Sequence, residues 1–176
     1  MAPFNLGEMT MEEATLLLKS LDESYGTNLS DNDIQYILKR IEWKLPYFIQ
    51  LFFNKLVSNK ERNNGKELEE NCTMIFHEII QEHELDTWSE RLAAYGADEK
   101  AARTLLSYLC QPDHKSERSF LEEVIKDKIP EQADVKEKYA VIKRMLETDG
   151  YIIQDENGIH FRSPIIREFW FNRYIQ

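Results

Sequence analysis

Hydrophobic residues change their spacing near the C-terminal end of the chain. Through residues 139–146 they recur at helical spacing, and Asp149-Gly150 then ends the helix. Two short apolar runs follow, residues 151–153 and 159–161, with turn-forming residues at 155–158 between them. The pattern predicts a helix followed by a β-hairpin.

Further helices surround this predicted hairpin. Ser163 suits an N-cap, and Pro164 suits the first position of an aromatic-rich helix over residues 165–174. Upstream, apolar residues at helical spacing predict two more helices before the one that leads into the hairpin. Together these elements predict a winged-helix domain over residues 97–176, a class of domain that recognises or regulates and rarely performs chemistry.

The N-terminal part has the pattern of a small helical bundle with defined helix ends. Thr10 and Glu13 have the spacing of a capping box, and Ser30 can cap a second amphipathic run. Pro46 suits the first position of a third helix. We therefore expect a mainly α fold, with a helical bundle over residues 1–60 ahead of the winged helix.

The stretch between these two predicted domains is expected to be helical as well. Residues 61–96 are expected to form a connector, with the domain boundary near Gly96. Asp98 can cap the helix that follows, and either Ser116 or Ser119 can begin the next one. These expectations use only the local preference of Asp, Ser and Gly for helix ends.

Charge is unevenly distributed along the chain. The 176 residues carry a formal net charge of −10, of which residues 1–96 hold −8 and residues 97–176 hold −2. Proteins that bind nucleic acid without sequence preference usually present a basic stripe, because Lys and Arg must replace the counterions condensed on the phosphates. The electrostatic signal for nucleic-acid binding is therefore weak.

The two cysteines and the chain's hydropathy favour a reduced, cytoplasmic protein. Cys72 and Cys110 lie inside helical patterns and not in a metal-ligand spacing, so we expect both to be packing residues. No stretch approaches the roughly 18 consecutive apolar residues of a membrane span. The first residues also lack the pattern of a signal peptide. We expect a soluble protein.

The sequence contains no recognisable motif for phosphate or metal chemistry. Gly65-Lys66 lacks the earlier glycine of a phosphate loop and is followed by Glu67, where Ser or Thr is required. His77 and His83 are six positions apart and lie on different helix faces, so an acidic surface is favoured over a metal site. We expect no catalysis by this chain alone, and no metal or cofactor held by its own residues.

Trp43, Lys44 and Pro46 form the first candidate binding site. A flat aromatic surface, a cation and the backbone amides of a proline-initiated helix would suit contact with a nucleotide or with another domain. The alternative is that Trp43, Tyr47 and Phe48 belong to the core, because large aromatic side chains mostly pack.

Basic residues near the C-terminus form a second candidate site, for nucleic acid or for a partner protein. Lys136, Lys143 and Arg144 lie on the helix before the hairpin, where they could contact phosphates. Arg162 and Arg167 lie among aromatic residues, a pattern that can stack on bases. The alternative is that these arginines border a helix that seals the winged-helix core.

Several motifs in this order resemble the C-terminal portion of prokaryotic AAA+/STAND-type ATPases. They are Met9-Thr10-Met11-Glu12-Glu13-Ala14, Trp43-x-x-Pro46-Tyr47-Phe48-Ile49-Gln50, Trp88-x-x-Arg91-Leu92 and Phe161-Arg162-Ser163-Pro164-Ile165-Ile166-Arg167-x-Phe169-Trp170. The resemblance covers nearly the whole chain, and its most specific part is the Ser-Pro-x-x-Arg-x-aromatic-Trp ending.

The resemblance implies a helical lid over residues 5–60 and a winged helix over residues 97–176, without the P-loop core that precedes them in the family. ATP and Mg²⁺ would then be bound only through that core, in cis or in trans. Pro46 matches the family's glycine-to-proline element near the nucleotide, whereas Glu42 or Lys44 stands where the family has glycine. The region of the first helix also lacks a sensor arginine.

Three functions remain open at this point. The first is a non-catalytic regulatory and coupling module, in which lid and winged helix mediate interdomain or partner contacts of an ATPase. The second is a free-standing winged-helix DNA-binding protein. The third is a protein-interaction adaptor that uses the acidic helical half.

Overall fold

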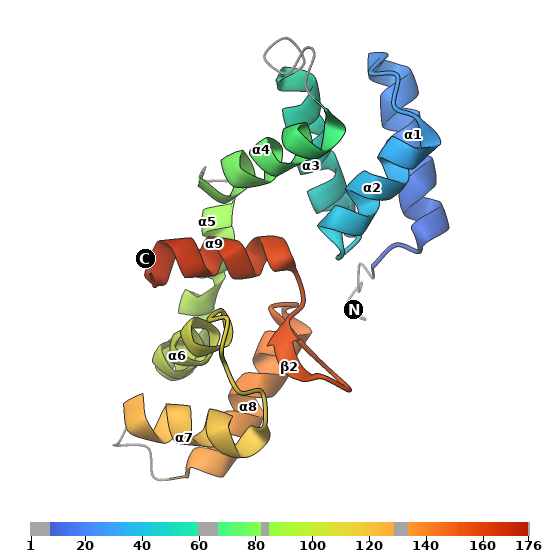
Figure 1. The fold of residues 1–176 in the computed structure, drawn as a ribbon. Helices are drawn as coiled ribbons and strands as arrows, with labels where there is room; N and C mark the ends of the chain where they lie inside the picture. Colours follow the sequence, from blue (N-terminus) through green and yellow to red (C-terminus); the bar gives the residue numbers. More distant parts are fainter. Residues whose placement is uncertain (1–7, 60–66, 82–84, 129–133, 176) are drawn as a thin grey trace. The chain divides into compact units, whose positions relative to one another are not determined.

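The computed structural model describes residues 8–59, 67–81, 85–128 and 134–175. It is mainly helical and has a two-stranded antiparallel sheet near its C-terminal end, which confirms the predicted fold class (Figure 1). The chain divides into two compact units, Met1–Gln81 and Glu82–Gln176.

The first unit contains four helices whose ends follow from the sequence. They are α1 (Met11–Tyr25), α2 (Asp31–Ile41), α3 (Pro46–Ser58) and α4 (Leu68–Gln81). The predicted capping box of Thr10 and Glu13 is present, and Ser30 caps α2 by accepting a hydrogen bond from the Asp33 amide. Pro46 occupies the first turn of α3, as expected.

The core of the first unit is built from one face of each helix. Helix α1 packs on α2 and α3, and α4 packs on α3. The fully enclosed side chains are aliphatic and aromatic, and they include Leu18, Ile34, Ile37, Leu38, Ile41, Phe48, Ile49, Phe52, Phe53 and Ile75. Burial of these side chains is the main stabilising contribution, at roughly 1.5–3 kcal/mol for each large aliphatic or aromatic group.

The second unit is arranged around α6 and ends in a hairpin and a helix. Its elements are α5 (Asp86–Glu90), the 3₁₀ helix η2 (Arg91–Asp98), α6 (Glu99–Leu109), α7 (Arg118–Lys128), α8 (Val135–Thr148), β1 (Ile152–Asp155), β2 (Gly158–Phe161) and α9 (Pro164–Tyr174). Helix α6 contacts η2, α7, α8, α9 and β2. It is therefore the central element of this unit.

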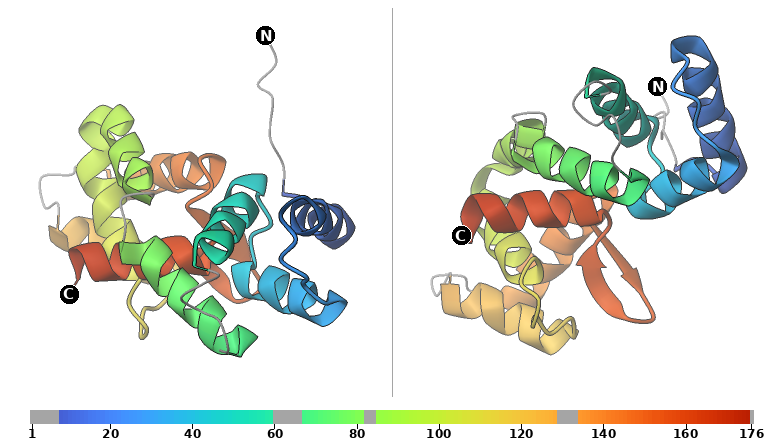
Figure 2. Two further views of the ribbon diagram at one scale, coloured as in Figure 1. Left: turned by 90° about the horizontal axis from the view of Figure 1, so that it is seen from above. Right: turned by 45° about the horizontal axis from the view of Figure 1, so that its top comes forward.

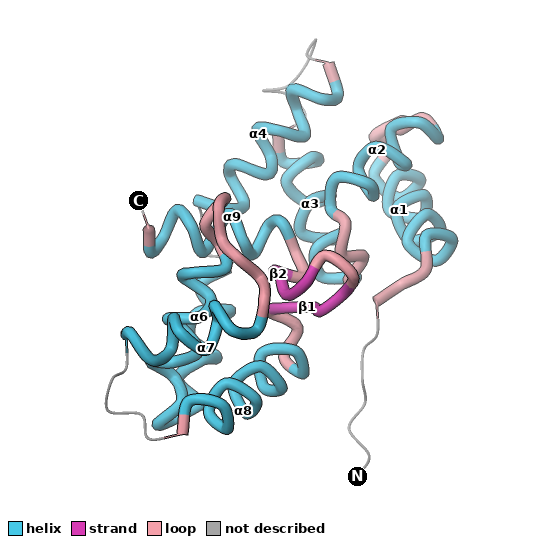
Figure 3. The backbone as a smooth tube through the Cα atoms, turned by 60° about the horizontal axis from the view of Figure 1, so that its bottom comes forward, coloured by secondary structure: helices cyan, strands magenta, loops and turns pink. Residues whose placement is uncertain are grey.

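The hairpin pairs as the sequence predicts. Strands β1 and β2 run antiparallel (Figure 2). In their register, Ile152 lies opposite Phe161 and Asp155 lies opposite Gly158. Figure 3 shows the two strands in the second unit, between α8 and α9 in the chain. The Arg162 amide donates to the Tyr151 carbonyl at 3.0 Å and extends the pairing by one step.

The unit boundary differs from the sequence-based expectation. Residues 61–96 do not act as one connector, because α4 packs with the first unit whereas α5 and η2 pack within the second. The boundary therefore lies between Gln81 and Glu82 rather than near Gly96. Gly96 instead marks a kink inside η2, where it adopts a φ of 57°.

Two capping predictions are wrong, and tertiary contacts explain both. Asp98 makes no capping hydrogen bond to α6, because its carboxylate forms an ion pair with Lys138 on α8. Helix α7 begins at Arg118 rather than at Ser116 or Ser119. The Ser116 hydroxyl donates instead to the Asn157 carbonyl in the hairpin turn, at 3.1 Å.

Membrane insertion by a helix finds no support in the part of the chain that the structure describes. Every helix there is too short or too polar to cross a bilayer.

We predict that Gly158→Ala destabilises the second unit by about 1–3 kcal/mol. Gly158 has a φ of 101°, and an added Cβ would overlap the Ser116 hydroxyl. Urea unfolding measures the loss. Gly26→Ala is the control in the first unit, since Gly26 also has a positive φ but has no atom within 4 Å of the added Cβ. An equal loss in both variants would contradict the close contact with Ser116.

Candidate functional site

The connector between α2 and α3, residues 42–45, is the first candidate site. Trp43 is buried, and its ring centroid lies 5.6 Å from that of Phe48. Tyr47 is 44% exposed and lies next to Pro46 at the beginning of α3. The aromatic residues of this motif therefore divide between core and surface.

The connector reverses direction through two very tight turns. The Trp43 amide donates to the Ile41 carbonyl at 2.7 Å, and the Leu45 amide donates to the Trp43 carbonyl at 2.9 Å. Each bond closes a three-residue γ-turn. Glu42, at the centre of the first turn, has φ of 57° and ψ of −70°, a conformation that is strained for any residue other than glycine.

Lys44 is held by groups of the protein itself. Its ammonium group donates to the Glu42 carbonyl at 2.8 Å and lies 3.6 Å from Oε1 of Glu8. Its backbone amide donates to the same Glu8 oxygen at 3.4 Å. The Lys44 side chain is only 18% exposed. Its charge therefore stabilises the connector itself.

The basic residues of α8 divide into two groups. Lys143 forms an ion pair with Glu147 at 2.6 Å and is therefore neutralised within the helix. Lys136 and Arg144 are exposed, and they lie on one side of α8 because they are eight positions apart. Two of the three predicted cations on this helix are thus available to a partner.

Arg162 and Arg167 both contribute to the structure of the second unit. Arg162 follows β2, is half-buried, and has its Nε shielded from solvent. Arg167 on α9 donates from Nε to the carbonyl of Cys110 at the end of α6, at 3.2 Å.

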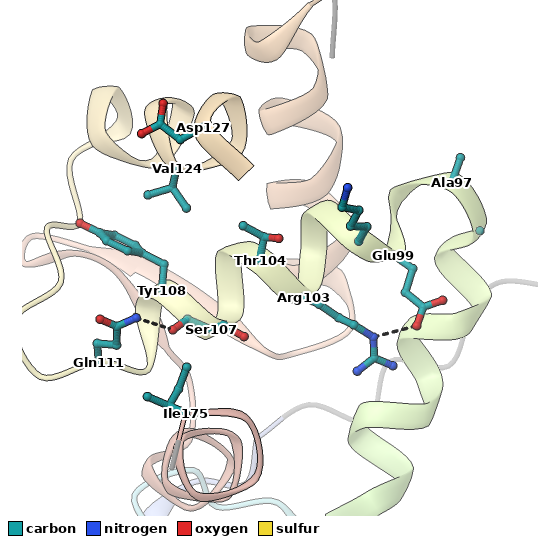
Figure 4. A pocket seen from close by; sticks show the side chains of 12 residues that line it. Ala97, Glu99, Arg103, Thr104, Ser107, Tyr108, Gln111, Val124, Asp127 and Ile175 are labelled. Atoms are coloured by element: carbon teal, nitrogen blue, oxygen red, sulfur yellow. Dashed lines mark hydrogen bonds and ion pairs between the residues drawn. The ribbon is translucent and has the colours of Figure 1, made fainter. Parts of the chain in front are cut away.

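A groove of about 850 Å³ lies along the outer face of α6. Thr104, Ser107 and Tyr108 lie along the helix, with Val124 of α7 on one side and Ile175, just after α9, on the other (Figure 4). The groove has the volume of a small-molecule site. Sequence reasoning did not find it, because its walls combine residues of η2, α6 and α7 with Ile175, which is far from them in the chain.

Arg103 lies at one end of this groove and is fully engaged by protein groups. Its Nε donates to Glu99 at 2.7 Å, and its two terminal nitrogens donate to the hydroxyl and the carbonyl of Ser89, each at 2.9 Å. The guanidinium carbon also lies 6.0 Å from the centre of the Trp170 ring and 5.9 Å from that of Tyr174. This arrangement joins α5, α6 and α9 and offers no free charge to a ligand.

The cysteines have the packing role that the sequence predicts. Cys72 and Cys110 are buried and not in a disulfide. Burial raises the pKa of the Cys72 thiol to about 12 and that of Cys110 to about 11, so both stay protonated at neutral pH. Thiol chemistry is therefore not expected from either residue.

Metal ligation has no site in the described residues. No group of three or more His, Cys, Asp or Glu side chains there lies close enough to hold an ion. His83 and the Gly65-Lys66 pair lie outside the described residues, so the structure does not address them.

No spacing of residues in the sequence predicts the contact of Glu8 with Lys44 or the strained backbone at Glu42. Glu8 contacts Lys44 across 36 positions, and no local pattern predicts such a pair. For Glu42 the sequence offers only the resemblance, in which Glu42 or Lys44 stands where the family has glycine. The Glu99–Arg103 pair, by contrast, has the i,i+4 spacing that a sequence search can find.

Comparison with known structures finds a likeness of fold. The chain is similar to a Walker-type ATPase of Pyrococcus abyssi, with a TM-score of 0.58 and 10% identity, over 93% of this chain and 42% of that ATPase. At this identity the likeness concerns the fold alone, and the chain spans less than half of the ATPase's length. No family model and no curated protein matches the sequence.

We predict that Glu42→Gly stabilises the first unit by about 1 kcal/mol. Relief of strain of about 1–3 kcal/mol is partly offset by the greater freedom of glycine in the unfolded chain. Urea unfolding measures the change, and Glu42→Ala is the matched control because it removes the side chain but keeps the strained backbone. A glycine variant no more stable than the alanine variant would contradict the strain at Glu42.

Proposed function

We propose that this chain is a non-catalytic regulatory and coupling module of an AAA+/STAND-type ATPase. The first unit would be the helical lid, the second unit would be the winged helix, and a P-loop core in cis or in trans would be the partner. The observation that carries the proposal is the likeness to a Walker-type ATPase, which covers 93% of this chain and so extends over parts of both units.

The connector supports the assignment of the first unit as a lid. The resembling family has a glycine-to-proline element at this place, and Pro46 begins α3 as that element requires. Glu42 adopts a backbone conformation that glycine favours, four positions before the proline. Under the proposal, Glu42 takes the place of the family's glycine and adds a side chain at that position.

The order of elements supports the assignment of the second unit as a winged helix. Three helices, α6, α7 and α8, precede the β1–β2 hairpin, and contacts join α7 to both α6 and α8. The hairpin turn is anchored to the loop between α6 and α7 by the bond from Ser116 to Asn157. A hairpin fixed in this way is a rigid surface feature that a partner can recognise.

Direct binding of a nucleotide by Trp43, Lys44 and Pro46 does not fit the geometry. Trp43 is buried, and the Lys44 ammonium is held by Glu8 and by the Glu42 carbonyl. A phosphate would have to displace both contacts. ATP and Mg²⁺ therefore enter the proposal only through the P-loop core, and the lid responds through its contact with that core.

Coupling then requires that the core bind the lid with different free energy in its two nucleotide states. Tyr47 is a suitable contact, because it is exposed at the beginning of α3, two residues after the end of the strained connector. A core that presses on this helix end in one state only would shift the lid between two positions.

We predict that the affinity of this chain for its P-loop core differs about fivefold or more between the ATP-bound and ADP-bound core, a coupling free energy of about 1 kcal/mol. Titration calorimetry with each nucleotide measures the two dissociation constants, and ATP turnover with and without the chain gives a second readout. Tyr47→Ala is expected to reduce the difference, and Leu16→Ala on α1, another exposed apolar residue, is the control. Equal affinities in both states would refute coupling.

DNA binding is the second candidate function, and Lys136 and Arg144 are the observation in its favour. Both are exposed on α8, next to the hairpin, as a helix that contacts phosphates requires. The electrostatics oppose it, because with the boundary at Glu82 each unit carries a net charge of −5. Attraction to DNA would depend on a few local cations.

If this second function holds, the double variant K136A/R144A lowers the slope of log affinity against log salt by about 2. Fluorescence anisotropy with a duplex at several salt concentrations measures the slope. Lys126→Ala on α7 is the matched control, since Lys126 is also exposed. No binding at about 50 mM salt, where phosphate contacts are strong, would eliminate this function.

A further inference from the structure

The residues that lead into α1 are fastened to the connector between α2 and α3. The Met9 amide donates to the Lys44 carbonyl at 3.0 Å, and the Lys44 amide donates to the Glu8 carboxylate at 3.4 Å. The Lys44 ammonium lies 3.6 Å from the same carboxylate oxygen. We call these contacts the Glu8–Lys44 clamp (the two chain segments can be followed in Figure 3).

The clamp closes on a strained turn of the first unit, the one centred on Glu42. Glu42 holds its unfavourable φ of 57° between two buried residues, Ile41 and Trp43. Lys44 contacts both sides, since its ammonium group bonds to the Glu42 carbonyl and its amide bonds to Glu8. The bonds to Lys44 therefore help to keep the strained turn closed.

The turn sets the direction in which α3 leaves α2. Ile41 is the last residue of α2, and Trp43 packs on Phe48 in the first turn of α3. Relaxation of Glu42 to a negative φ would break the bond from Trp43 to Ile41 and would rotate one helix against the other. A small displacement at Glu8 is thus linked to a change in the angle between two core helices.

We propose that the Glu8–Lys44 clamp is a conformational switch that makes the α2–α3 angle depend on the position of the residues leading into α1. Displacement of residues 8 and 9 opens the clamp, and the strained turn at Glu42 then relaxes. The role of this switch rests on the proposed function, in which a P-loop core would move those residues. Its existence rests only on contacts within the first unit.

Hydrogen–deuterium exchange of the full chain, followed by mass spectrometry, tests the switch without any partner. In Glu8→Gln and in Lys44→Met, the amides of residues 43–45 are expected to exchange about tenfold faster, as for the loss of a hydrogen bond to a charged group. Amides in the middle of α2 should keep their rates. Glu23→Gln, at an exposed position on α1, is the matched control for loss of one negative charge.

Glu42→Gly provides the second arm, because it removes the strain without touching the clamp. In this background Glu8→Gln is expected to accelerate exchange at residues 43–45 less than about threefold, since a relaxed turn needs the clamp less. Unchanged exchange in Glu8→Gln and Lys44→Met, or an equal acceleration with and without Glu42→Gly, would overturn the switch.

A third arm separates this inference from the proposed function. Exchange at residues 43–45 is compared with the P-loop core present, in ATP and in ADP. If the isolated chain responds to Glu8→Gln but the nucleotide has no effect, the switch stands and the coupling function fails. If the isolated chain does not respond, the switch fails whatever the core does.

Discussion

The first unit depends on a constraint at three consecutive residues. Ile41 and Trp43 are both buried, whereas Glu42 between them is exposed, so the chain must turn sharply at a residue that has a side chain. Burial of two large apolar groups, at roughly 1.5–3 kcal/mol each, exceeds the cost of about 1–3 kcal/mol for the strained backbone. The hydrophobic core thus imposes the strain, and the contacts of Lys44 help to contain it.

The second unit is organised by a different kind of interaction. Arg103 joins α5, α6 and α9 through Glu99, Ser89 and the rings of Trp170 and Tyr174. Because each of its three nitrogens donates to a protein acceptor, the guanidinium specifies one arrangement of these helices, which apolar packing alone would not do. The Trp170 indole N–H adds to this by donating to Ser107 on α6 at 3.1 Å.

Local signals in the sequence predicted the helix ends and the hairpin, and tertiary contacts decided the rest. Thr10, Ser30, Pro46 and Ser163 act on neighbouring amides or on their own backbone, so their roles follow from a few residues. Asp98 failed as a cap because Lys138, 40 positions away, offers its carboxylate an opposite charge. A prediction made from neighbouring residues cannot include an ion pair with so distant a residue.

For the candidate sites, the sequence predicts even less, because tertiary contacts decide which side chains are available for binding. A basic residue is identified in a sequence by its type, but its availability depends on its partners in the fold. Lys143 is neutralised by Glu147 and Arg167 is committed to the Cys110 carbonyl, whereas Arg144 remains exposed on the same helix as Lys143.

This selective use of cations bears on the choice between the proposed functions. A protein that relies on phosphate contacts must keep its cations in solvent, because the gain comes from releasing counterions of the nucleic acid. Here Lys44, Arg103 and Lys143 are bound to acceptors within their own units, and each unit is net negative. Charges used in this way stabilise internal geometry, which is what a module that transmits a conformational change to another protein requires.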